Sequence, residues 1–260
     1  MTDVASLRTG RFTDDTAHLA GRAIRIWSRN PASIAGAVVF PLLFFGLFNL
    51  VMRRLMQARG FDYAQLLPST VVVQAMFFAA MSSAYYVAAD RLSGVMARLR
   101  SLPIHRAAPI VARSLGDMSR ATISVVVLLL VGIAAGMRLR AGVGGAIGFV
   151  LVALVFVGVV ALGMGLLGYR ASSPDAAASM ASMPYLPLVM LSNGFAPLSD
   201  FPGWLQPFVR HQPVTRTIDV LRALSSGGST VPPLAIWAGW MVGLAFVFAV
   251  LSARAFAKAA

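Results

Sequence analysis

The chain has 260 residues, of which 58% are hydrophobic and only 12% are charged, and its mean hydropathy is +0.77. Because ordinary soluble chains are about 25% charged, this composition excludes a soluble domain and predicts an all-α polytopic membrane protein. The net charge of +13 does not indicate a nucleic-acid partner, since the arginines are spread over the loops between apolar runs, as expected of a protein facing anionic lipid. The absence of cysteine excludes disulfides and thiolate metal sites.

Residues 1–32 are polar, and we predict that they form a cytoplasmic segment with one interfacial helix. Asp14, Asp15 and Thr16 are typical of a helix start. The following residues divide into an apolar face (Leu19, Ala20, Ala23 and Trp27) and a basic face (Arg22, Arg25 and Arg29). This pattern favours a helix lying on the membrane surface, although a solvated helix would show the same division.

Six apolar runs predict a bundle of six membrane spans over residues 33–251, followed by a cytoplasmic tail over residues 252–260. The whole chain, 1–260, is therefore interpreted as a single transmembrane domain. The predicted spans cover residues 33–52, 65–89, 121–137, 143–169, 176–195 and 231–251.

The second and fifth predicted spans are candidates for lining a substrate path. The second carries polar side chains that need partners inside hydrocarbon, and the fifth contains two prolines. Broken helices at membrane depth are tolerated where they line a cavity or are buried in protein, and a simple proline kink is the alternative. The candidate residues are Gln74, Phe78, Ser82, Tyr85, Tyr86, Pro184, Pro187 and Asn193.

The polar stretch 90–120, between the second and third spans, predicts two short amphipathic helices. The first has Leu92, Val95, Met96, Leu99 and Leu102 on one face, with Arg91 and Arg98 opposite. Pro103 ends it, because proline lacks an N–H and disfavours a helical residue before it. The second has Arg106, Arg113, Asp117 and Arg120 on its polar face, with Arg113 and Asp117 spaced for an ion pair. A solvated loop and a structured hairpin both fit this pattern.

Residues 196–230 are too polar to span a membrane, and they predict two short helices dipping into the outer leaflet. An aromatic set at helical spacing (Phe201, Trp204, Leu205 and Phe208) precedes an apolar stripe (Val214, Ile218 and Leu221). With six spans, the side that holds both termini carries 14 of the 22 basic residues and the other side carries 8. This bias predicts that both termini are cytoplasmic.

The sequence offers little of its own for catalysis. The single lysine, Lys258, lies at the end of the chain, so an ATP-binding P-loop is excluded. His18, His105 and His211 lie in separate regions, which argues against a metal or hydrolytic site. Asp90 and Asp175 sit at span ends, where they form no proton relay. We therefore expect no catalytic residue, no metal and no cofactor in this chain.

Two motifs carry a resemblance to a known family. The run RLRSLPIHR, from Arg98 to Arg106, resembles the RL-x-x-LP-x-x-R signature of the ABC type-2 export permeases. The segment FPGWLQPF, from Phe201, with the HQPV and LRAL runs that follow it, resembles the external region of the daunorubicin-resistance group within that family. Together with the number and order of the spans, the resemblance covers nearly the whole chain.

The resemblance implies export of a hydrophobic or amphipathic drug, antibiotic or lipid, driven by a separate ATPase subunit that binds ATP and Mg²⁺. A second permease subunit would complete the transporter in the plasma membrane, with the substrate path at the interface between the two permeases. The hairpin would dock on the ATPase through Asp90, Arg91, Leu92, Met96, Arg98, Leu99, Arg100, Pro103, His105 and Arg106.

One departure from the family pattern concerns the residues after the second span. The family carries an acidic residue there in a pattern like R-E-x-G, whereas this chain reads Arg91-Leu92-Ser93-Gly94. Asp90 is a candidate to replace it, or the partner permease supplies it, which favours a heteromeric pair. Two other classes of function stay open, a secondary carrier that needs no ATP and a membrane scaffold that transports nothing.

Overall fold

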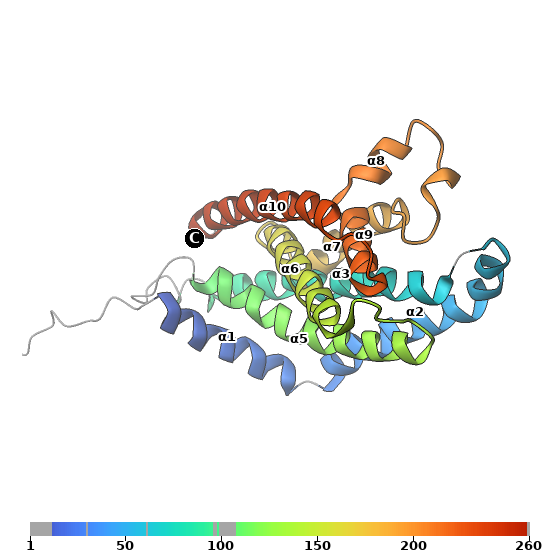
Figure 1. Cartoon of the computed structure of the whole chain (residues 1–260). Helices are drawn as coiled ribbons and strands as arrows, with labels where there is room; N and C mark the ends of the chain where they lie inside the picture. Colours follow the sequence, from blue (N-terminus) through green and yellow to red (C-terminus); the bar gives the residue numbers. More distant parts are fainter. Residues whose placement is uncertain (1–11, 30, 61, 96–97, 99–107, 259–260) are drawn as a thin grey trace, which may run out of the picture.

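The computed structural model describes residues 12–29, 31–60, 62–95, 98 and 108–258. Over these residues the chain is a bundle of α-helices joined by short turns (Figure 1). The helices are α1 Phe12–Ser28, α2 Pro31–Ala58, α3 Tyr63–Leu92, α5 Ala108–Ala134, α6 Gly142–Gly168, α7 Pro174–Met190, α8 Gln206–His211, α9 Pro213–Ser226 and α10 Val231–Lys258, with a 3₁₀ turn, η2, at Leu198–Asp200.

Helix α3 is the centre of the bundle, and α2, α5, α6, α7 and α9 pack around it (Figure 1). Its alanines and serines let neighbouring backbones approach closely, because these side chains are small. One close approach is at Gly168 of α6, where an added Cβ would lie 2.5 Å from the carbonyl oxygen of Ala84. Small residues therefore decide how tightly the core packs.

Among the described residues, five helical segments are long and apolar enough to cross a membrane: Val38–Ala58, Tyr63–Leu92, Val111–Ala134, Gly142–Gly168 and Val231–Ala255. The multi-pass helical class predicted from composition is confirmed. The first and last of these spans are buried over only 11% of their most apolar window, against 72% for α3. The outer surfaces of α2 and α10 therefore expose large apolar side chains, as expected of helices that face lipid or another membrane subunit.

Two predicted boundaries were wrong. The third span was placed at residues 121–137, but α5 begins at Ala108 and is apolar enough to span from Val111. The re-entry helix and the third span, predicted as separate elements, form one continuous helix. The fifth span was placed at residues 176–195, but α7 ends at Met190 after 17 residues, and Pro184 and Pro187 lie inside it without interrupting it.

The segment between α7 and α10 contains the predicted short helices, α8 and α9. The predicted apolar stripe lies on α9, but it packs into the core of the bundle instead of facing lipid, since Val214, Ile218 and Leu221 are at most 1% exposed. The predicted aromatic helix was wrong: only Phe208 lies in α8, while Phe201, Trp204 and Leu205 precede it, and Trp204 is 79% exposed. Prolines at 202 and 207 bracket this stretch, and they favour a turn over a continuous helix.

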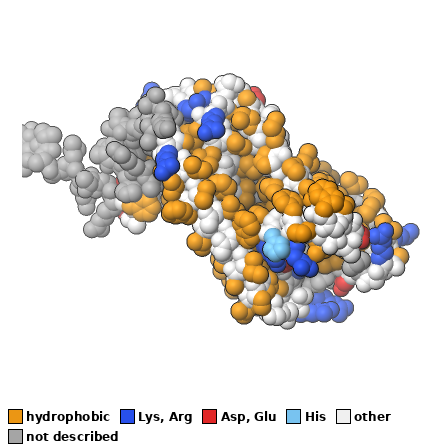
Figure 2. Space-filling view, turned by 90° about the horizontal axis from the view of Figure 1, so that it is seen from above, with side chains coloured by type: hydrophobic (Ala, Val, Ile, Leu, Met, Phe, Trp, Pro, Cys, Tyr) orange, Lys and Arg blue, Asp and Glu red, His pale blue; other side chains and the backbone are white. Residues whose placement is uncertain are grey.

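Basic side chains on the surface lie mainly toward the two ends of the bundle. The face seen in Figure 2 carries hydrophobic side chains over most of its length, with arginine and lysine side chains toward its two ends. Helix α1, the start of α5 and the end of α10 share one end of the molecule (Figure 1). The turn between α2 and α3 and helix α8 share the other.

Candidate functional site

Three charged residues of α5 form a buried network against α3. Arg113, Asp117 and Arg120 are spaced i, i+4 and i+7, so they project from one face of the helix. Asp117 is 3% exposed and Arg120 is 6% exposed. The prediction that Arg113 and Asp117 pair is confirmed, but the polar face that they belong to packs against α3 instead of facing water.

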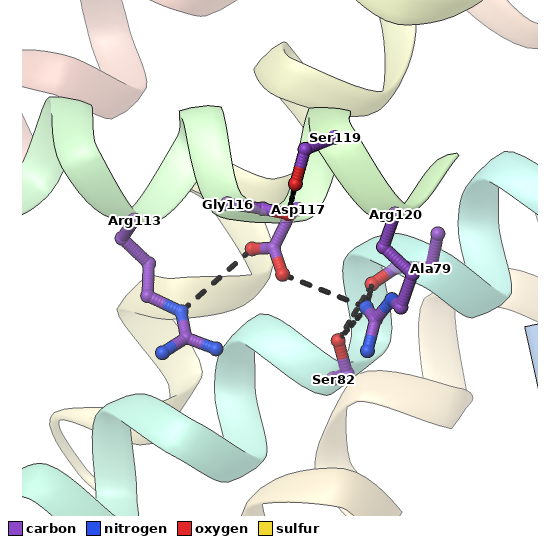
Figure 3. A network of polar contacts seen from close by, with 7 residues as sticks. All are labelled: Ala79, Ser82, Arg113, Gly116, Asp117, Ser119 and Arg120. Carbon is purple, nitrogen blue, oxygen red and sulfur yellow. Dashed lines mark hydrogen bonds and ion pairs between the residues drawn. The ribbon is translucent and has the colours of Figure 1, made fainter. Parts of the chain in front are cut away.

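The network is held by both ion pairs and hydrogen bonds (Figure 3). Asp117 Oδ1 lies 3.5 Å from Arg120 Nη2, and Asp117 Oδ2 lies 3.8 Å from Arg113 Nε. Arg120 Nη2 also donates to the carbonyl oxygen of Ala79 at 2.6 Å and to Ser82 Oγ. Because a buried charge is costly unless it is paired and hydrogen-bonded, these partners are what allow Arg120 to be buried between the helices.

Arg113 is held from a second side by an aromatic ring. Its guanidinium carbon lies 4.3 Å from the centroid of the Tyr86 ring, and the Tyr85 ring lies edge-on to that of Tyr86. A cation over an aromatic face gains about 1 kcal/mol or more when it is shielded from water. Tyr86, named from the sequence as a path residue, therefore positions a charge, whereas the side chain of Tyr85 is 39% exposed.

Helix α1 covers this network from outside. An added Cβ at Gly116 of α5 would lie 2.8 Å from Ala23 Cβ of α1, so only glycine permits this approach. A water-sized hollow of about 20 Å³ lies between Ala23, Tyr86 and the charged face of α5. The amphipathic helix predicted for the N-terminal segment is confirmed, with Ala20 buried on its inner face.

The end of α3 carries the described part of the predicted ATPase-docking residues. Arg91 donates to the carbonyl oxygen of Tyr169 at 2.9 Å and to that of Ala171, where α6 ends. A cation at a helix C-terminus is favoured by the helix dipole. Leu92 and Arg98 are exposed, and Asp90 is half-buried.

Gly94, just after α3, has a φ of +74°, a conformation that glycine adopts without strain, and it separates α3 from the hairpin. Six predicted docking residues lie outside the described part of the chain: Met96, Leu99, Arg100, Pro103, His105 and Arg106. Their role stays a prediction.

The predicted path residues do not gather at one place. In the middle of the bundle, Gln74 Nε2 donates to Tyr185 Oη at 2.7 Å, and the ring centroids of Phe78 and Tyr185 are 4.9 Å apart. Pro184 directly precedes Tyr185. Ser82 and Tyr86 belong to the charged network. Pro187 is exposed on α7.

Asn193 lies at the opposite end of the bundle from α1, in a second polar cluster. Its Nδ2 donates to Asp219 Oδ1 at 2.6 Å, and its carbonyl oxygen accepts from Arg222 Nη2 at 3.2 Å. Burial raises the pKa of Asp219 above its usual range, although Asn193 and two arginines oppose the shift. Burial also lowers the pKa of Arg222 to about 10. The cluster ties α9 to the turn after α7.

Sequence reasoning missed that Asp117 and Arg120 lie in the same continuous helix as the apolar run of the third predicted span. A signal was present, because charges of opposite sign recur at i, i+4 and i+7 on a helix that continues into an apolar run without a break. In the described residues, no group of three or more His, Asp or Glu side chains is placed to hold a metal ion.

A bundle of long apolar helices around a buried central helix is the architecture of a polytopic membrane protein. The chain belongs to the ABC-2 type transporter family, whose profile matches residues 15–225. It is accordingly a membrane permease of that family.

Several curated relatives are similar over most of the chain. It is 30% identical over 253 residues to the "Probable doxorubicin resistance ABC transporter permease protein DrrC" of Mycobacterium tuberculosis, which covers 95% of this chain and 90% of that protein. It is 27% identical to the "Daunorubicin resistance ABC transporter permease protein DrrB1" of Streptomyces coeruleorubidus, over 90% of this chain and 82% of that protein. It is also 32% identical to the "Doxorubicin resistance ABC transporter permease protein DrrB" of M. tuberculosis, over 72% of this chain and 65% of that protein. The resemblance inferred from the two motifs is confirmed.

Proposed function

We propose that this chain is the membrane-spanning subunit of an exporter that moves a hydrophobic or amphipathic drug, antibiotic or lipid out of the cytoplasm or inner leaflet. The observation that carries the proposal is the similarity, over 95% of the chain, to a permease named for doxorubicin resistance. The described part of the bundle adds an apolar interior that contains a few paired polar groups, the usual character of a site for amphipathic ligands.

A separate ATPase subunit would supply the energy and hold ATP and Mg²⁺. The sequence supports this, because the only lysine is Lys258 and a P-loop requires a lysine at the start of a helix. The hairpin after α3 would dock in a groove on the ATPase, so that nucleotide-driven closure moves the helices as rigid bodies.

The proposed topology has six spans, with α7 as the fifth, both termini in the cytoplasm, and α8 and α9 on the outside. Helix α7 is about 25 Å long at 1.5 Å per residue, a little shorter than a hydrocarbon core of about 30 Å. Packing against α3 and α6 would shield its ends from lipid. The excess of basic residues on one side supports the orientation.

A second permease subunit would face the exposed apolar side chains of α7, such as Met183 and Leu186, with the substrate path between α3 and α7 at the interface. Heteromeric pairing is supported by the missing glutamate after α3, since the partner would supply the acidic group. Asp90, half-buried beside that position, is the alternative. Cross-linking by a photoreactive substrate that never touches α3 or α7 would contradict this path.

The docking proposal is tested by the double substitution Arg98→Glu with Leu99→Asp. We expect the ATPase to dissociate during purification and substrate-stimulated ATP hydrolysis to fall at least tenfold. The reversed charge at position 98 and the lost apolar contact at position 99 together cost more than about 1.4 kcal/mol at one interface. Arg59→Glu is the control, since Arg59 is exposed at the other end of the bundle. Unchanged assembly and hydrolysis would rule out this docking surface, and transport by the chain alone in proteoliposomes would indicate a carrier.

A further inference from the structure

A cavity of about 100 Å³ lies beneath α1, between α3, α5 and α6. This is several times the roughly 15 Å³ that a cavity needs to hold one water, so it can admit a small polar group. Part of its lining is apolar, including Leu19, Val87 and Leu162. The lining also includes three charged residues, Arg22 from α1, Asp90 from α3 and Arg113 from α5.

The charges of this cavity are gathered but incompletely paired. The guanidiniums of Arg113 and Arg22 both act on the carboxylate of Asp90, yet among the described residues neither lies within 4 Å of it. Arg113 Nε is buried without a hydrogen bond, because Asp117 Oδ2 at 3.8 Å is too distant to accept one. Asp90 is half-buried in the cavity wall with two guanidiniums that do not contact it, so this arrangement is complementary to a ligand that brings both an acceptor and a cation.

We propose that this cavity binds the headgroup of a phospholipid that carries both a phosphate and a primary ammonium, taken from the leaflet bordering α1. Arg22 and Arg113 bind the phosphate, since guanidiniums match its geometry. Asp90 accepts hydrogen bonds from the ammonium. The apolar lining residues contact the first part of the acyl chains, which continue along the amphipathic helix α1 into the bilayer.

The ammonium is what distinguishes this ligand from other phosphates. A primary ammonium donates up to three hydrogen bonds, whereas a choline headgroup donates none and a glycerol headgroup brings no positive charge to Asp90. A free phosphate would meet the two arginines and leave Asp90 unpaired. The site is independent of the exported compound, because it requires only that α1 lies at the membrane surface.

The test is native mass spectrometry of the full-length purified chain exposed to equimolar phosphatidylethanolamine, phosphatidylcholine and phosphatidylglycerol. We expect about tenfold more retained ethanolamine lipid than choline lipid, the usual value of hydrogen bonds to a charged group. Asp90→Asn should bring that ratio close to one while total retained lipid stays the same. Arg22→Gln should lower the retention of all three lipids, whereas Arg25→Gln should not, because Arg25 lies on α1 outside the cavity.

Four outcomes would overturn the proposal. For the unsubstituted chain, these are equal retention of ethanolamine and choline lipids, and stronger retention of phosphatidylglycerol than of phosphatidylethanolamine. For the variants, they are an unchanged ethanolamine-to-choline ratio in Asp90→Asn and equal losses of lipid in Arg22→Gln and Arg25→Gln. Adding inorganic phosphate separates the sources. Displacement of the ethanolamine lipid by millimolar phosphate alone would identify a free-anion site instead.

Discussion

At the scale of single residues, the carboxylate of Asp117 is the centre of the α3–α5 junction. It is the only acidic group within ion-pair distance of Arg113 and Arg120 among the described residues, so the two arginines share one negative charge. Breaking a buried ion pair by removing one partner leaves an uncompensated charge, which costs more than the pair itself contributes.

We expect Asp117→Asn to lower the free energy of unfolding by about 3 kcal/mol, because it leaves two buried guanidiniums facing a neutral amide. Denaturant titration of the purified chain in detergent, followed by helical signal, measures the change. Asp62→Asn is the matched control, since Asp62 is exposed and its side chain makes no cap hydrogen bond. Equal effects of the two substitutions would show that Asp117 is not structurally important.

Asp219 gives a prediction on pH. Its pKa is raised in the folded chain, so its protonated form stabilises the fold below the unfolded pKa of about 3.8, and this contribution is lost as the pH rises through the folded pKa. Asp219→Asn removes the dependence while it keeps an acceptor for Asn193. We expect the melting temperature of the variant, relative to the unsubstituted chain, to rise between pH 4 and 7. A constant difference across that range would contradict the role given to burial.

At the scale of helices, the contact between α1 and α5 depends on a missing side chain. Gly116→Ala places a methyl 2.8 Å from Ala23 Cβ, and neither atom belongs to a flexible side chain. We therefore expect α1 to separate from α5 and its amides to exchange with deuterium several-fold faster. Gly46→Ala in α2 is the control, because nothing lies within 4 Å of the added methyl. Unchanged exchange along α1 would mean that the two helices can slide apart at no cost.

The elements themselves were largely predictable, because long apolar runs and prolines determine where membrane helices start and stop. Hydropathy located α2, α3, α6 and α10, and helical spacing located α1 and the buried stripe of α9. The start of α5 was not predictable in this way, since Asp117 and Arg120 look polar in isolation and become compatible with burial only through Ala79, Ser82 and each other. The separation of Gln74, Ser82 and Asn193 into distinct clusters also depends on tertiary packing.

At the scale of the whole molecule, the path of α7 decides whether the two ends of the chain lie on one side. If α7 crosses the membrane, Ser172 and Trp204 lie on opposite sides. The chain contains no cysteine, so single cysteines can be labelled without background.

We expect a membrane-impermeant maleimide to label Trp204→Cys in intact cells and Ser172→Cys only after permeabilisation. Both positions are exposed, so access is not limited by packing. Ser28→Cys, on exposed α1, should behave like Ser172→Cys. Labelling of Ser172→Cys and Trp204→Cys from the same side would establish five spans.

The hydrogen bonds from Arg91 to the carbonyl oxygens of Tyr169 and Ala171 have a mechanical consequence. They join the end of α3 to the corner between α6 and α7, and Gly94, with a φ of +74°, follows directly after α3. A movement of the hairpin would then be transmitted to α3, α6 and α7 together. We expect Arg91→Met to leave ATP hydrolysis intact and to weaken its coupling to transport, measured as substrate moved per ATP in proteoliposomes. An unchanged ratio would show that these hydrogen bonds transmit nothing.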